Sequence, residues 1–324
     1  MEKPTLGIIG LGKMGGNMAL QAYDKGYNVI GHDPTFNKEL ESKGVHQEAS
    51  LESFVLKLSK PKIIFIYIPS GRAVDKLLDQ LAGLVSKGDI LIDGGNSYWG
   101  DSIKRSLRLK EKGIYFVDCG TSGGVEGARH GACFMAGGDN DALHYVSPIL
   151  NDLAVENGFI HTGASGSGHF VKLVHNGIEF GMLQAIGEGM DLLAHYRTDL
   201  DFPGILKVWN HGSVIRSWLV ELMEKMYTEK KGFESVPSFI EDTGEVNWLV
   251  ADALRMEVAT PVIAQSVMQL FSSRDTNHIS DKAIAMMRHG FGGHPFGEDK
   301  GIKIERKSGK IENEESNFLY EKEK

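Results

Sequence analysis

Cysteine is scarce in this chain. Its 324 residues include two, Cys119 and Cys133, which is too few for a disulfide framework and fits a reducing compartment. Neither has an obvious His or Lys neighbour that would activate a thiolate, so we expect two small core residues. The chain also lacks an apolar run of the roughly 20 residues that a membrane span requires, and no export signal opens it. We therefore expect a cytoplasmic protein with no membrane partner.

Positive charge is in deficit as well. The chain has 35 Lys and Arg against 43 Asp and Glu, which gives a formal net charge of −8. This balance argues against nucleic acid or an anionic membrane as the partner, although a small pocket can still be basic enough for an anionic metabolite. Glycine, by contrast, is abundant. The 40 glycines cluster at the ends of expected strands, where backbone must approach a ligand closely.

The chain divides into two parts with different periodicity. Up to about residue 164, continuous Ile/Val/Phe runs alternate with helix-period stretches, which is typical of a doubly wound α/β domain whose parallel strands are buried on both faces. After the Gly/Ser break "GASGSG", strand-like runs stop and an all-α domain is expected at 165–297, followed by a charged, mobile tail at 298–324. The expected strands are 5–10, 28–33, 62–70, 89–95, 114–120 and 132–138; the expected helices are 14–25, 50–59, 71–86, 100–112, 140–152, 168–196, 203–209, 214–228, 244–255, 260–272 and 278–288.

A glycine-rich turn follows the first expected strand. In "IIGLGKMGGN", Gly10, Gly12 and Gly15 form G-x-G-x-x-G at a strand end that opens a helix, with Lys13 and Met14 inside the motif. The first glycine permits a tight turn, the second lets backbone approach a pyrophosphate, and the third allows close helix–strand packing. Because strand, motif and helix occur in the required order, we expect a Rossmann-type dinucleotide site.

Asp33 bears on which dinucleotide binds. It lies 23 positions after Gly10, near the spacing of about 20 expected for an acid that binds the adenosine ribose. A carboxylate there would repel a 2′-phosphate, so NAD is favoured over NADP, although His32 and Thr35 leave room for NADP. The alternative is that Asp33 is the N-cap of a helix starting at Pro34.

Two further strands end in unusual loops. "DGGNS" places Asn96 after two glycines, and "GTSGG" places Ser122, Gly123 and Gly124 similarly. Ligands bind outside the carboxyl ends of strands in open α/β sheets, so both loops should line one crevice. "GTSGG" also matches the G-x-S-x-G elbow of hydrolases, but that alternative needs a helix directly after Ser122, and "GGVEGARHG" is a poor helix opening.

The helix expected from residue 168 is apolar around most of its circumference, yet it carries Lys172, His175, Asn176 and Glu179. At about 100° per residue, Lys172, Asn176 and Glu179 project from one face, and His175 lies beside them. The alternative is a solvated polar stripe with a charge pair. Desolvation would favour the neutral amine of Lys172 and make it a general base, with Glu179 as a separate acid.

At this point the chain resembles the decarboxylating 6-phosphogluconate dehydrogenases, in particular their short bacterial, NAD-linked type, within the β-hydroxyacid dehydrogenases. The matching segments extend to about residue 296 and are "GLGKMGGNM", "DGGNS", "GTSGGVEGARHG", "KLVHNGIEFGMLQ", "WNHGSVIRSWL" and "RHGFGGH".

The resemblance implies that Lys172 is the base and later the proton donor to the C3 oxygen, and that Glu179 protonates C1 of an enediol to give ribulose 5-phosphate without a metal. It also implies that a sugar acid phosphate is bound, and that the phosphate is reached by C-terminal residues of a neighbouring subunit, hence a homodimer or homotetramer. The residues implied in binding substrate or nicotinamide are Asn96, Ser122, Gly123, Gly124, His175, Asn176, Arg288 and His294.

Departures from the family pattern concern the phosphate. Phe180 replaces a usual tyrosine and Glu245 a lysine. The arginine expected further on falls near Ser272, and Arg274 is the candidate substitute for it. His175 and His294 also have an alternative role as structural histidines. The rival functions are a related dehydrogenase that oxidises another 3-hydroxy acid without decarboxylation, for which Glu179 would be unnecessary, and a nucleotide sensor without turnover, for which Lys172 would be unnecessary.

Overall fold

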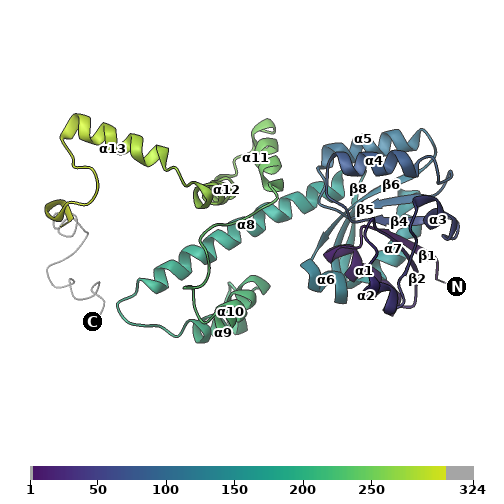
Figure 1. Cartoon of the computed structure of the whole chain (residues 1–324), viewed down its shortest axis with the longest axis horizontal. Coiled ribbons are helices and arrows are strands. Elements are labelled where there is room, and N and C mark those ends of the chain that lie inside the picture. Colours follow the sequence, from purple (N-terminus) through teal and green to yellow (C-terminus); the bar gives the residue numbers. More distant parts are fainter. Residues whose placement is uncertain (1–2, 304–324) are drawn as a thin grey trace. The chain divides into compact units, whose positions relative to one another are not determined.

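The computed structural model describes residues 3–303 (Figure 1), so most of the tail expected at 298–324 lies outside the described residues. Its first part contains an eight-stranded sheet with the order β3-β2-β1-β4-β5-β6-β7-β8. Neighbouring strands are parallel except for the antiparallel pair β6–β7. The strands are β1 (Thr5–Ile9), β2 (Asn28–His32), β3 (His46–Gln47), β4 (Ile63–Ile66), β5 (Ile90–Asp93), β6 (Tyr115–Ser122), β7 (Ala132–Gly138) and β8 (Ala154–Gly163).

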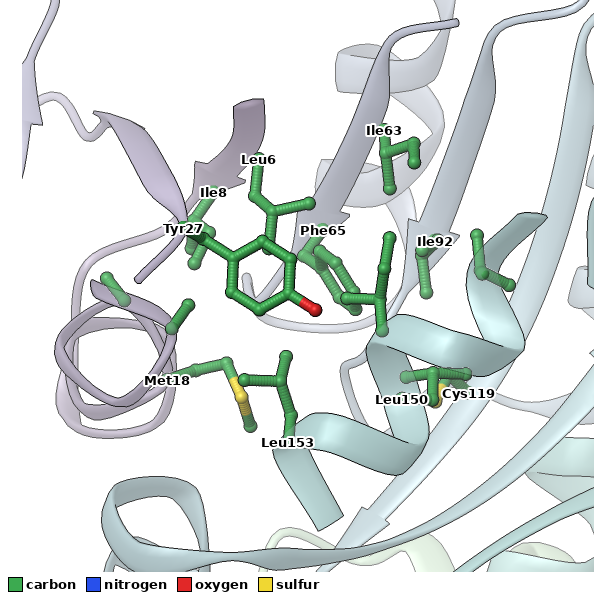
Figure 2. Close-up of a cluster of buried hydrophobic side chains, with 14 of the residues drawn as sticks. Leu6, Ile8, Met18, Tyr27, Ile63, Phe65, Ile92, Cys119, Leu150 and Leu153 are labelled. Atoms are coloured by element: carbon green, nitrogen blue, oxygen red, sulfur yellow. The ribbon is translucent and has the colours of Figure 1, made fainter. Parts of the chain in front are cut away.

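Helices cover both faces of this sheet, because the central strands alternate apolar side chains between two cores. Figure 2 shows one core, in which Leu6, Ile8 and Phe65 of the sheet meet Met18 of α1 (Lys13–Asp24) and Leu153 of α7 (Asn140–Leu153). On the other face, Ile64 and Ile66 lie in the core that includes residues of α3 (Leu51–Leu56), α4 (Arg72–Leu81) and α5 (Trp99–Lys110). The expected α/β domain is confirmed.

The rest of the described chain is helical, as expected. Its helices are α8 (Ser167–Ala194), α9 (Phe202–Gly212), α10 (Trp218–Lys230), α11 (Glu245–Arg255), α12 (Pro261–Arg274) and α13 (Ile279–Gly292). Two compact units divide these helices: α8 up to Gly177 and α11 up to Asp252 belong with the sheet, and the remainder forms the second unit. In that second unit, Met190 of α8 packs with Phe202 and Leu206 of α9 and Val220 of α10.

No helix within residues 3–303 is long and apolar enough to cross a membrane.

Four short or irregular elements were not expected from the sequence. They are α2 (Lys38–Ser42), β3, α6 (Gly124–His130) and β8. β8 has no fully buried residue, and β3 has two residues, so neither carries the apolar run by which a buried strand is recognised. The expectation that both cysteines are core residues is wrong for Cys133, which is exposed on β7, and right for Cys119.

Candidate active site

The glycine turn between β1 and α1 has the form that a dinucleotide loop requires. Gly10 has a φ of +87°, and a side chain there would clash with the carbonyl oxygen of Tyr67 at the end of β4. A side chain at Gly15 would clash with the carbonyl oxygen of Gly10, whereas one at Gly12 would meet nothing within 4 Å. The tight turn at Gly10, the open approach at Gly12 and the close helix packing at Gly15 are therefore the three roles that the motif predicts. The amides that open α1 are suited to a pyrophosphate.

Lys13 and Met14 form the start of α1, Lys13 exposed and Met14 half-buried, at the same end of the helix as the open Gly12. Their assignment to the cofactor stays a prediction.

Asp33 holds this turn against the end of β2. One carboxylate oxygen accepts a hydrogen bond from the Leu11 amide at 2.8 Å, and the other accepts from the Thr35 amide at 2.8 Å. A helix cap is not its role, because α2 begins at Lys38 and its N-cap is Asn37. A carboxylate can accept about four hydrogen bonds, so acceptor capacity is left for ribose hydroxyls.

The loop that carries Asn96 is shaped by buried charge. The Asp93 carboxylate, fully buried at the end of β5, accepts from the Gly95 amide at 3.1 Å and the Ser97 hydroxyl at 2.7 Å. Arg105 of α5 donates to the same carboxylate at 3.4 Å. Asn96 itself is exposed on this loop, where a substrate or nicotinamide could reach it.

Arg105 extends the network to α4. Its Nε donates to Asp75 at 2.8 Å and its Nη2 to the Gly71 carbonyl at 3.0 Å. The bond from Arg105 lowers the pKa of Asp75. The sequence signal for this residue is its helical spacing: Arg105 falls on the same face of α5 as Ser102 and Leu109, and all three are buried.

Ser122 ends β6 and lies against α8. Its hydroxyl is 3.1 Å from Nε2 of His175. Gly123 and Gly124 follow with φ values of +109° and +59°, and α6 begins at Gly124. The expectation that this segment opens no helix is therefore wrong: a left-handed glycine at the N-cap supplies the turn. The other ring nitrogen of His175 faces an amine and an amide, Lys172 Nζ at 3.4 Å and Asn176 Oδ1 at 3.2 Å.

Lys172 lies at the centre of this cluster. Its ammonium or amine group donates to Oδ1 of Asn176, one turn further along α8. Lys172 is half-buried, and Asn176 is almost fully buried. The structure thus brings together Lys172, His175, Asn176 and Ser122, four residues that the sequence predicted for one site. A solvated polar stripe, the alternative for this face of the helix, does not fit the burial of Lys172 and Asn176.

Three predicted residues belong to the second unit. Glu179 follows seven positions after Lys172 on α8 and is half-buried. Arg288 is exposed on α13, and the backbone carbonyl of His294 accepts a hydrogen bond from His289 at 2.8 Å. Arg274, the expected substitute for the phosphate arginine, donates to Asp242 at 3.0 Å. The catalytic and binding roles of these residues stay predictions.

Comparisons with known proteins match both halves of the chain to one family. The family described as the NAD binding domain of 6-phosphogluconate dehydrogenase matches residues 5–163, and the 6-phosphogluconate dehydrogenase C-terminal domain matches residues 168–289. A Bacillus subtilis protein, provisionally named a 6-phosphogluconate dehydrogenase, is 44% identical over 89% of this chain and 98% of its own length. An NAD(+)-dependent, decarboxylating 6-phosphogluconate dehydrogenase of Haloferax volcanii is 38% identical over 89% of this chain and 97% of its own.

Solved structures show the same relationship. The 6-phosphogluconate dehydrogenase of Plasmodium falciparum superposes with a TM-score of 0.78 at 26% identity, covering 94% of this chain and 68% of its own. A 3-hydroxyisobutyrate dehydrogenase of Mycobacterium tuberculosis shares the fold, with a TM-score of 0.66 at 21% identity over 84% of this chain and 94% of its own. Because both halves of the chain match and relatives align along nearly their whole length, this chain belongs to the 6-phosphogluconate dehydrogenase family of NAD(P)-dependent oxidoreductases.

Proposed function

We propose that the protein oxidises 6-phosphogluconate with NAD and releases carbon dioxide, forming ribulose 5-phosphate. The observation that carries this proposal is the cluster on α8, in which Lys172 is held by Asn176 and lies beside His175, which in turn contacts Ser122 at the end of β6. This is the arrangement of a positioned base with adjacent hydroxyl and amide groups for a polyol substrate. The family relationship and the glycine turn support the cofactor.

The chemistry divides between the cofactor and the side chains. NAD, held by the glycine turn and Asp33, would supply the acceptor for the hydride that leaves C3 of the substrate. Lys172 takes the proton of the C3 hydroxyl, so that a 3-keto acid forms. When the C1 carboxylate leaves as carbon dioxide, its bonding electrons pass to the C3 oxygen, which Lys172 then protonates. Glu179 finally donates a proton to the carbon that lost the carboxylate, which becomes C1 of ribulose 5-phosphate. Lys172 takes the hydroxyl proton back in the same step, so that the carbonyl group forms again.

The remaining side chains hold the substrate. Besides its contact with His175, the Ser122 hydroxyl can hydrogen-bond to a substrate hydroxyl, and the backbone amides of Gly123 and Gly124, where α6 begins, are suited to the carboxylate. Asn96, on its rigid loop, adds an amide that can pair with a hydroxyl. The phosphate is assigned to Arg288 and His294 of a neighbouring subunit, since Arg274 is bonded to Asp242.

The test follows reduced nicotinamide and carbon dioxide together while the protein is incubated with 6-phosphogluconate, other 3-hydroxy acids, and either NAD or NADP. We expect one carbon dioxide for each reduced cofactor. Lys172→Met should lower kcat by about 10²–10⁴-fold, the usual effect of a general base, without changing the Kd for NAD. Lys104→Met, which removes an exposed lysine of α5, is the matched control and should keep full activity.

Other outcomes select the rivals. Reduced cofactor without carbon dioxide would assign the protein to the non-decarboxylating dehydrogenases. NAD binding without turnover of any acid would favour a sensor. Full activity in Lys172→Met would remove Lys172 as the base.

A further inference from the structure

One face of β6 contacts the first turns of α8 at three successive positions. Because strand residues alternate between faces, Asp118, Gly120 and Ser122 point to the same side of the sheet. Val117 and Cys119 point to the opposite side, into the core formed with α1 and α7. The three residues on the α8 side each contact a different level of that helix.

Asp118 makes the first contact, at the start of α8. Its fully buried carboxylate accepts from the amide of Gly166 at 2.6 Å and from the amide of His169 at 2.9 Å, one on each oxygen. The hydroxyl of Ser165 is 3.3 Å away. The first amides of a helix have no partner within it, so this carboxylate from a neighbouring strand caps α8. Burial raises the pKa of Asp118, while the bonds from these amides favour its charged form.

Gly120 makes the second contact. A side chain at this position would clash with Cβ of Lys172, so the absence of one lets α8 lie directly on the strand. Gly168 repeats this from the helix side, since a side chain there would clash with the backbone of Asp118, Met135 and Gly137. Ser122 makes the third contact, through its bond to His175.

His169 adds a lateral contact from the same turn. Its Nε2 is 3.1 Å from the carbonyl oxygen of Asp93, which can only accept, so Nε2 carries the hydrogen. Its Nδ1 lies at hydrogen-bond distance from the hydroxyl of Ser102, 2.8 Å away. The beginning of α8 is thus bonded to β5 and α5 as well as to β6.

We propose that Asp118 is a positioning residue for the catalytic lysine. By capping α8 from β6, it fixes the position of the helix relative to the strand, and therefore where Lys172 lies against Gly120 and His175 against Ser122. This rests on the proposed function, in which Lys172 is the base. The contacted helix residues, 166 and 169, 172 and 175, are three apart, so they follow one i, i+3 row that runs obliquely across the surface of α8. A shift of α8 at its capped end therefore displaces Lys172 as well, and a displacement of about 1 Å can lower the rate about 10²-fold.

The experiment compares two buried aspartates of the full-length chain. Asp89 is the matched control, because its buried carboxylate also accepts from two amides, those of Lys62 and Ser86 at 2.8 Å each. Asp89 lies just before β5, at the opposite end of that strand from Asp93. Each aspartate is replaced by Ala and by Asn. The readouts are kcat, KM, the Kd for NAD, the melting temperature, and amide hydrogen exchange of residues 166–172.

Asp118→Ala should lower kcat about tenfold to a hundredfold, leave the Kd for NAD unchanged and speed exchange in residues 166–172. Asp118→Asn, which keeps one acceptor oxygen, should recover part of kcat. Asp89→Ala should lower the melting temperature while kcat and exchange in 166–172 stay as in the wild type. Should Asp118→Ala fail to fold, Gly120→Ala takes its place: it keeps the cap but puts a methyl group against Lys172, and kcat should again fall at least tenfold.

Wild-type kcat in folded Asp118→Ala, or in both Asp118→Asn and Gly120→Ala, would overturn the proposal. An equal loss of kcat in Asp89→Ala would also overturn it, by assigning the effect to general destabilisation. If the wild-type protein turns over no sugar acid, the proposed function fails. The role of Asp118 in positioning α8 is then tested by hydrogen exchange alone, and unchanged exchange in residues 166–172 of folded Asp118→Ala would overturn that role.

Discussion

At the scale of single residues, spacing predicted which side chains matter but not how they are held. The i, i+4 separation of Lys172 and Asn176 places them together on any helix, and the structure bonds them. The bond between His175 and Ser122 could not be read from the chain, because it depends on which strand α8 packs against. Asp33 is a similar case, since its bonds to Leu11 and Thr35 exist only in the folded turn.

Asp33 gives the prediction that belongs to this scale. Asp33→Ala removes both the acceptor for ribose hydroxyls and the bond to the Leu11 amide, so kcat/KM for NAD should fall about tenfold to a hundredfold, the range of hydrogen bonds to a charged group. The ratio of kcat/KM for NADP to that for NAD should rise, because the charge that repels a 2′-phosphate is gone. Steady-state kinetics with both cofactors measures this ratio.

Asp33→Asn serves as the control, because it keeps an acceptor oxygen but not the charge. If repulsion sets the preference, Asn should raise the ratio as Ala does. If the ratio of kcat/KM for NADP to that for NAD is unchanged in both variants, Asp33 shapes the turn but does not set the cofactor preference.

At the scale of elements, the buried central strands and the long helices were predictable, and the sheet edge was not. Continuous apolar runs mark β1, β4 and β5, whose residues are almost all buried. β8 has no fully buried residue and pairs with β7 at one end of the sheet, so its sequence is typical of a loop. The antiparallel direction of β7 also escaped prediction, since its sequence is as apolar as that of its parallel neighbours.

The prediction at this scale concerns Arg105, which joins α5 to α4 and β5. Arg105 is 2% exposed, and Arg105→Met would leave the buried carboxylate of Asp93 without its cation. Removing one partner of a buried pair typically costs about 3–5 kcal/mol of unfolding free energy, to be measured by urea denaturation.

Arg108→Met is the comparison, on the same helix. Arg108 pairs with Asp79 at 3.1 Å, but both side chains are largely exposed, so a loss below about 1 kcal/mol is expected. Equal losses in the two variants would show that the Arg105 network contributes no more than a surface pair.

At the scale of the whole molecule, our assignment of the substrate phosphate to Arg288 requires a second copy of the chain. α13 contains no buried residue, and among its apolar side chains Met286 is 66% and Phe291 76% exposed. Apolar surface of this kind supports an oligomer. Composition and periodicity do not decide whether α13 packs on another copy, because a helix that does so has the same pattern as one that packs within its own chain.

Mixing two inactive variants tests this assignment. Lys172→Met and Arg288→Ala should each be nearly inactive as homodimers. In a mixed dimer, one of the two sites would combine an intact Lys172 with an intact Arg288 of the partner, so statistical reassortment should restore about a quarter of wild-type activity. A mixture that stays as inactive as its components, while sedimentation shows that the chains have exchanged, would mean that Arg288 acts within its own chain or not at all.

The alternation along β6 has a consequence for how this segment can vary in length. Loss of a single codon between Asp118 and Ser122 would turn every later side chain of the strand to the other face, so the lysine and the histidine would lose their supports together. In a library of single-codon deletions that is screened for turnover, we expect no active variant with a deletion within residues 118–122. Active variants should be found with deletions in the exposed stretch 234–238. The length of β6 between Asp118 and Ser122 is thus fixed by the contacts that alternate along it.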